Sequence, residues 1–190
     1  MAASDRRLNA PPEARLSARF FELGLARCIV SSYAILWAGT ILFTLAALPV
    51  AGHLREVFGY RFALASSGTP GMAAFIAANN VREAGIPLLF AVLKIRGRRW
   101  PVIVGDVVVG ASLTVNVALG GLALGTYGIR LLPYIPQWPL EWGGLALVLA
   151  AWRRARSGRQ DPCELALLAI ATGILLCLAA LLETYAVPQG

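Results

Sequence analysis

Eight residues that lie within or beside long apolar stretches are the candidates for function in this sequence. They are amides, carboxylates, one arginine and one proline: Asn79, Asn80, Arg82, Glu83, Asn116, Pro136, Glu141 and Glu183. An ionisable side chain in hydrocarbon costs about 2.5–3.5 kcal/mol on insertion scales, so such groups usually face the interior of a helix bundle or a wet cavity. Together they can line a polar path through a membrane, or they can bond across helix contacts.

The densest polar cluster lies at residues 79–83. Asn79 and Glu83 are four apart and share one face of a helix, whereas Arg82 and Glu83 are separated by about 100°. Pro87 follows, and a proline inside a helix removes a backbone hydrogen bond and kinks the helix. Two interpretations stay open. The cluster marks the outer end of a span, or the helix is broken or tilted and its polar side chains make interior contacts.

A second polar position, Asn116, lies far from both ends of its apolar stretch. Gly121 and Gly125 follow it with GxxxG spacing. Small residues let membrane helices approach closely, and an asparagine can bond across such an interface. The pattern therefore predicts a close helix–helix contact.

Three prolines at every third position, starting at Pro133, prevent a regular helix until Pro139. A proline is tolerated in the first turn, so a helix can begin there, with Glu141 where the helix dipole favours an anion. Trp138 and Trp142 suit an outer aromatic belt. This segment is either a helix start near the interface or a re-entrant element that lines a polar cavity.

The sequence shows no enzyme signature. His53 is the only histidine, so no HExxH zinc pair exists, and we expect it outside the membrane, where it cannot pair with an intramembrane serine. Cys28, Cys163 and Cys177 have no CxxC spacing and give no zinc or haem pattern. We expect these cysteines to be small core residues. The sequence thus predicts no catalytic residue, no metal and no cofactor.

The composition indicates which elements must hold these residues. Of the 190 residues, 58% are hydrophobic and 14% charged, and the mean hydropathy is +0.68. A soluble domain has about 45–50% apolar and about 25% charged residues. A membrane span needs about 20 apolar residues. We predict an all-α, polytopic integral membrane bundle of about five transmembrane helices, at residues 28–52, 71–95, 101–128, 131–152 and 165–187.

The basic residues predict how this bundle is oriented. The net charge is +7, and most of the 17 basic residues lie in three segments on one predicted side: 1–27, 94–99 and 153–159. Positive loops stay in the cytoplasm, so we expect a cytoplasmic N-terminus and an external C-terminus. Topology and anionic lipids then explain the basicity, and nucleic-acid binding is not expected. Residues 1–24 form a basic cytoplasmic segment, and residues 25–188 form the transmembrane domain.

Over residues 70–188 the sequence resembles the stage II sporulation protein M family of bacterial membrane proteins. Asn79-Asn80 opens a span, and Asn116 precedes glycines at 120, 121 and 125, as in that family. Residues 136–141 are similar to its Pro-His-Gly-x-x-Glu stretch, with Gln137 and Trp138 in place of the His and Gly. Residues 179–188 are similar to its closing Ala-Ala-x-x-Glu-x-x-x-x-Pro pattern.

The resemblance implies a multi-pass protein of the bacterial inner membrane without chemistry of its own. The family's namesake is a platform for enzymes that degrade the cell wall, and other members act beside ATP-driven partners in peptide maturation or export. Two hypotheses follow. The first is a non-enzymatic scaffold or accessory subunit, with a cell-wall hydrolase, an ATP-driven transporter or a second copy of the chain as partner. The alternative is a transport subunit or small channel for ions, solutes or peptides that uses the intramembrane Asn and Glu residues.

Overall fold

The computed structural model describes residues 12–58, 68–95, 101–159 and 161–186. Five long helices make up most of this part: α2 (Pro12–Ala47), α4 (Pro70–Ile95), α5 (Pro101–Tyr127), α6 (Trp138–Arg156) and α7 (Pro162–Tyr185). Three short helices join them: η1 (Leu48–Val50), α3 (Ala51–Phe58) and η2 (Gly128–Tyr134). The described residues contain no strand, and the predicted all-α fold is confirmed.

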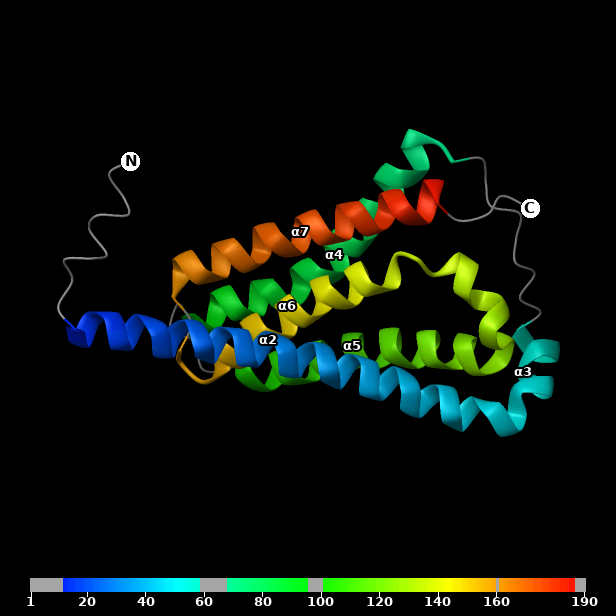
Figure 1. Ribbon diagram of the computed structural model, residues 1–190, viewed down its shortest axis with the longest axis horizontal. Helices are drawn as coiled ribbons and strands as arrows, with labels where there is room; N and C mark the ends of the chain where they lie inside the picture. The colour runs from blue at the N-terminus through cyan, green and yellow to red at the C-terminus, as the bar shows by residue number, and fades with distance from the viewer. Residues whose placement is uncertain (1–11, 59–67, 96–100, 160, 187–190) are drawn as a thin grey trace.

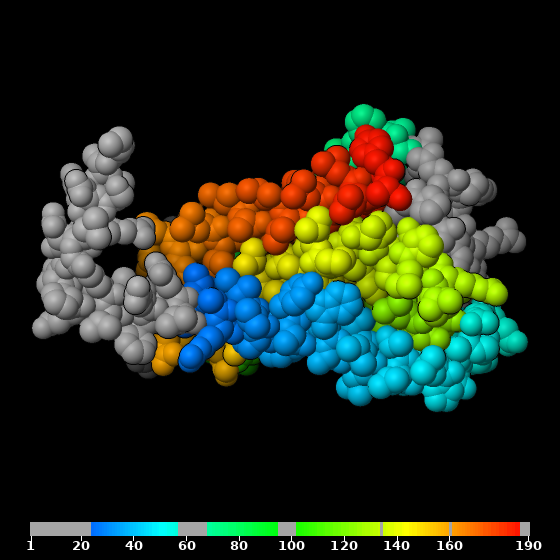
Figure 2. All heavy atoms as spheres, viewed as in Figure 1, coloured from blue at the N-terminus to red at the C-terminus, as the bar shows by residue number. Residues whose placement is uncertain are grey.

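The long helices form a bundle in which successive members run in opposite directions (Figure 1). α2 packs along α5, and α4 packs along α7. Between these pairs lies α6, which contacts all four of the other long helices. In the space-filling view of Figure 2, α6 shows only as a narrow band between α7 and α2.

Four helical segments are long and apolar enough to span a membrane: Gly24–Glu56, Pro70–Lys94, Val102–Pro133 and Pro162–Tyr185. Their outer surfaces carry many exposed large apolar side chains, among them Val30, Ile103 and Leu167. Lipid is the surrounding that such surfaces require. The chain is therefore a polytopic membrane protein, as the composition predicts.

The fourth predicted span, at 131–152, is wrong in its start and in its apolar character. Residues 131–134 belong to the 3-10 helix η2, and α6 begins only at Trp138. α6 carries Glu141 and three basic residues in its last turn and is not among the apolar helices. Ten of its 19 residues are buried against the other helices. Because the other helices surround α6, its own surface does not need to be apolar. The hydropathy of its sequence therefore does not reveal that α6 runs through the bundle.

The other element predictions have mixed outcomes. α2 is continuous across the expected boundary at residue 24, and α4 is continuous through Pro87. The prediction of core cysteines is wrong for two of the three, since Cys163 and Cys177 are exposed.

The predicted close contact at the glycine pair is confirmed, and α2 is the partner. A Cβ atom placed on Gly121 would lie 2.6 Å from the Thr40 carbonyl oxygen, and one on Gly125 would lie 2.5 Å from that of Thr44. Only glycine lets the two backbones come this close. This contact fixes α5, and with it Asn116, against α2.

Trp142 and Trp152 fasten α6 to its neighbours. The Trp142 Nε1 donates to Thr40 Oγ1 of α2 at 3.1 Å, and the Trp152 Nε1 donates to Asp106 Oδ1 of α5 at 3.0 Å. Trp142 is 4% exposed and stacks on Trp138. The prediction that Trp142 belongs to an outer aromatic belt is therefore wrong, because the ring lies in the core.

A buried ion pair stabilises the turn between α6 and α7. Arg154 and Glu164 form an ion pair in which both side chains are nearly inaccessible, and the Arg154 Nη2 also donates to the Arg159 carbonyl at 3.1 Å. Asp161 caps α7 by accepting from the Cys163 amide at 2.8 Å. Gly158 supplies the positive φ of 68° that reverses the chain. This turn holds α7 beside α6. α7 carries Leu176, which lines the candidate functional site.

Candidate functional site

Polar residues from three helices meet at a half-open cavity of about 70 Å³ between the helices. Four predicted site residues line it: Asn80 and Glu83 from α4, Asn116 from α5 and Glu141 from α6. Trp142, Leu145 and Leu176 supply the remaining walls. A water molecule needs roughly 10–15 Å³ of such space, so the cavity can hold several.

The α4 wall follows from the helical period that the sequence indicates. Asn79 Nδ2 donates to Glu83 Oε1 at 3.3 Å, which is the four-residue contact expected on one helix face. Asn80 and Glu83 both reach the cavity, and the Asn80 Nδ2 is buried without a hydrogen-bond partner among the described residues. A buried amide of this kind usually bonds to water or ligand.

Pro87 interrupts the backbone hydrogen bonding of α4 one turn after Glu83. It lies four residues after Glu83 and has no N–H, so the carbonyl of Glu83 lacks its normal helical partner. Pro87 is buried, and the helix passes through it unbroken. Of the two interpretations of the polar cluster, interior contacts are observed, while the predicted break is not.

The α5 wall is the Asn116 amide. Its Nδ2 donates to the Ser112 carbonyl one turn earlier at 2.9 Å. One N–H of the amide is thus used within the helix, and Oδ1 accepts no hydrogen bond from a described residue. Asn116 bonds to its own helix, and the described residues show no bond from it across the α2–α5 contact.

The α6 wall carries Glu141, which lies in the first turn of that helix. From the end of α5 the chain folds back through η2 before α6 begins, so this turn lies inside the bundle (Figure 1). Both interpretations of this segment stay open: Glu141 lies in the first turn of α6 and lines the cavity, whereas the described lining includes no residue of η2. The Glu141 carboxylate has no hydrogen bond to any described residue, and it is close enough to Glu83 and Glu183 for their charges to interact.

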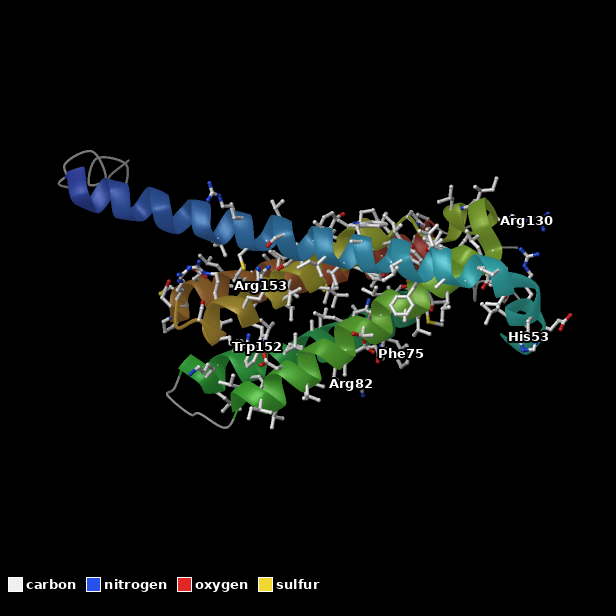
Figure 3. All side chains as sticks on the ribbon, turned by 90° about the horizontal axis from the view of Figure 1, so that it is seen from below. His53, Phe75, Arg82, Arg130, Trp152 and Arg153 are labelled. Atoms are coloured by element: carbon white, nitrogen blue, oxygen red, sulfur yellow. The ribbon has the colours of Figure 1, made fainter. Side chains whose placement is uncertain are left out.

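The remaining predicted site residues lie outside the cavity lining. Asn79 holds Glu83, and Glu183 lies near Glu141 on α7. Pro136 is exposed in the turn before α6. Arg82 points away from the cavity and is exposed on the bundle surface near the middle of α4 (Figure 3). Its Nη2 donates to Asn79 Oδ1 at 3.3 Å.

The sequence did not single out the apolar walls. Leu145 lies one turn after Glu141, so it follows from the helix period once Glu141 is assigned to the cavity. Leu176 comes from the uniformly apolar α7, where no local signal marks the residue that faces α4 and α6.

The chemistry of the lining is that of hard oxygen ligands. Carboxylates and amide oxygens suit small hard cations or a hydrated proton. Two carboxylates that face one small cavity in a low-dielectric bundle repel each other, and a bound cation or proton removes that repulsion. Among the described residues, no group of three or more His, Cys, Asp or Glu gathers as a metal site would.

Comparison of the chain with protein-family models, curated proteins and solved structures gives no significant match. The resemblance to the stage II sporulation protein M family therefore stays a prediction from the residues. The functional argument below rests on the geometry of the chain itself.

Proposed function

We propose that the protein is a membrane transport subunit that binds a small cation or a proton in this half-open cavity. One observation carries the proposal: Asn80, Glu83, Asn116 and Glu141, from three different helices, line the same cavity in the bundle. Polar side chains are costly in such a place and are usually found where ions or protons pass. The bacterial cell membrane is the proposed location.

The four residues have separate roles in this proposal. Glu83 and Glu141 supply the charge that attracts the cation, and Asn79 orients Glu83 through its amide. Asn116 offers an uncharged oxygen, and Asn80 bonds the water that the cation carries with it. Trp142, Leu145 and Leu176 keep the rest of the lining apolar, so the charges are poorly screened and bind more strongly.

Purified protein in liposomes tests this proposal. Gradients of H⁺, Na⁺ and K⁺ are applied in turn, and their decay is followed with ion-sensitive dyes. We expect wild-type protein to dissipate at least one gradient faster than empty liposomes. Glu141→Gln and Glu83→Gln each should lower that rate at least tenfold, because each removes one of the two charges on the cavity.

Glu56→Gln is the matched control for these variants. Glu56 is a highly exposed glutamate near the end of α3, paired only loosely with His53 at 3.9 Å. It undergoes the same chemical change away from the cavity, and its flux should equal that of wild type. Absence of wild-type flux in all three gradients would reject the proposal, as would full flux in the Glu83→Gln/Glu141→Gln double variant.

The second candidate is a non-enzymatic scaffold or accessory subunit of a membrane complex, as the family resemblance implies. Arg82 favours it, because a cation exposed to lipid near the middle of a span is stabilised by an acidic group from outside the chain. Both functions are compatible with one chain, since the cavity and Arg82 lie on different faces of α4.

A further inference from the structure

A single charge interrupts the apolar outer face of α4. Phe75, Ile86 and Leu89 are exposed there, 69%, 46% and 55% respectively, and Ala78 lies between Phe75 and Arg82 on the same face. These positions follow the spacing of one helix face, with Arg82 at its centre. Lipid suits the apolar members of this face but not the guanidinium group.

Arg82 is too far from either end of α4 for water to be its natural partner. It lies 12 residues after Pro70 and 13 before Ile95. At 1.5 Å per residue, these separations are about 18 Å and about 20 Å, while half of the hydrocarbon core is about 15 Å. Figure 3 agrees, since Arg82 lies between the end that holds Arg130 and His53 and the end that holds Arg153.

The described part of the chain gives Arg82 no counter-charge. Its hydrogen bond goes to the neutral Asn79, and Glu83 faces the cavity on another side of the helix. Asp106 is already occupied by Trp152 and Arg156. Arginine inside a membrane is usually paired, and its fork of donors matches a carboxylate.

A second copy of the chain is a poor source for that carboxylate. A symmetric contact between two α4 faces would bring Arg82 against Arg82. Glu83 and Glu141 are turned into the cavity, and Glu183 belongs to α7, near Glu141. These described acids are therefore unavailable for such a contact, which favours a complementary group from a different protein.

We propose that the outer face of α4 docks a transmembrane helix of a partner protein, with an Asp or Glu of that helix paired with Arg82. Ala78, next to Arg82, lets the partner approach closely, as small residues do at membrane helix contacts. Phe75, Ile86 and Leu89 pack against its apolar side chains. This contact is independent of cation binding in the cavity.

Photo-crosslinking in native membranes tests the contact. A photoreactive amino acid is placed at Ala78 or Ile86 on this face, and at Ile174 on the exposed side of α7 as the control. We expect an adduct with one membrane protein from positions 78 and 86 only. Peptide mapping should place the crosslink in a transmembrane segment that contains Asp or Glu. Adducts with lipid alone, with a second copy alone, or with a span that lacks an acid overturn the proposal.

Charge variants give the second readout. Arg82→Leu and Arg82→Glu should lower the crosslink yield at Ile86 at least tenfold. Arg130→Leu, which removes an exposed cation at the end of the bundle, should leave it unchanged. Size-exclusion profiles identify any variant that fails to fold. Replacement of the partner's acidic residue by Arg should then restore the crosslink in the Arg82→Glu variant. An unchanged crosslink yield at Ile86 in the Arg82→Leu variant would overturn the proposal. Liposome flux depends on no partner, so its outcome is separate from this one.

Discussion

Arg82 and Glu83 are neighbours in the chain, yet they belong to different surfaces. A step of one residue turns the side chain by about 100° around a helix, so Glu83 reaches the cavity while Arg82 reaches the outer face. Asn79 bonds to both, at 3.3 Å in each case. In the two proposals, one turn of α4 serves both the cavity and the outer face, so changes at Glu83 and at Arg82 should separate the two functions.

The hydrogen bond from Trp142 to Thr40 leads to a prediction about the thermal stability of the bundle. Trp142→Phe removes the donor to Thr40 Oγ1 but keeps most of the ring contact with Trp138. A net hydrogen bond is worth about 0.5–1.5 kcal/mol, and about 1 kcal/mol shifts the unfolding midpoint of a chain this size by about 2–4 °C. We expect a loss of that order in a thermal melt in detergent.

Trp138→Phe is the control for that measurement. Trp138 stacks on Trp142, but its indole N–H donates to no described residue, so the same substitution removes ring area without removing a side-chain bond. Because only the indole of Trp142 donates a side-chain bond, the midpoint of Trp138→Phe should fall less than that of Trp142→Phe. Equal losses in the two variants would mean that the Thr40 bond contributes no measurable stability.

At the scale of elements, the glycine pair of α5 decides how closely α2 and α5 pack. Gly125→Ala would place a Cβ 2.5 Å from the Thr44 carbonyl oxygen, a backbone atom that cannot move without displacing α2. Overpacking of this kind typically costs about 1–3 kcal/mol. We expect a lower thermal midpoint in detergent and, because α5 carries Asn116, a weaker flux in liposomes.

Gly110→Ala separates this packing effect from helix propensity. Gly110 is exposed on the same helix, and nothing lies within 4 Å of a Cβ placed there. Alanine is better than glycine in a helix interior by roughly 0.5–1 kcal/mol. The Gly110 variant should therefore be at least as stable as wild type. If Gly125→Ala were as stable as Gly110→Ala, that result would show that α2 can move away from α5 without loss of stability.

For the whole molecule, residue patterns predicted most of the architecture and about half of the cavity lining. Four apolar spans and the GxxxG contact follow from composition and helical period. Asn80, Glu83, Asn116 and Glu141 were candidates from the sequence, but their meeting at one cavity depends on how three helices pack and was not predicted. The apolar walls were not predicted either, because Leu176 looks like every other leucine of α7. α6 was misread as an apolar span because burial among other helices replaces the lipid-facing surface that hydropathy detects.

Because α6 was wrongly predicted to be an apolar span, the number of times the chain crosses the membrane is the property that most needs measurement. The end of α5 and the start of α7 lie at opposite ends of the bundle, with α6 running between them (Figure 1). If α6 crosses the membrane despite its charges, Cys163 at the start of α7 and Ile129 in η2 are on opposite sides. Both are exposed, Ile129 by 82%, so a membrane-impermeant maleimide can report their sides.

The measurement needs two single-cysteine chains, both with Cys28→Ala and Cys177→Ala. The first keeps Cys163, and the second has Cys163→Ser and Ile129→Cys. Because basic segments stay in the cytoplasm, we expect Ile129→Cys to react in intact cells and Cys163 to react only after permeabilisation. Labelling of both from the same side would show that α6 does not cross. The reverse pattern would preserve the five-pass bundle but place the N-terminus outside, and the cavity would then face ion gradients of the opposite direction.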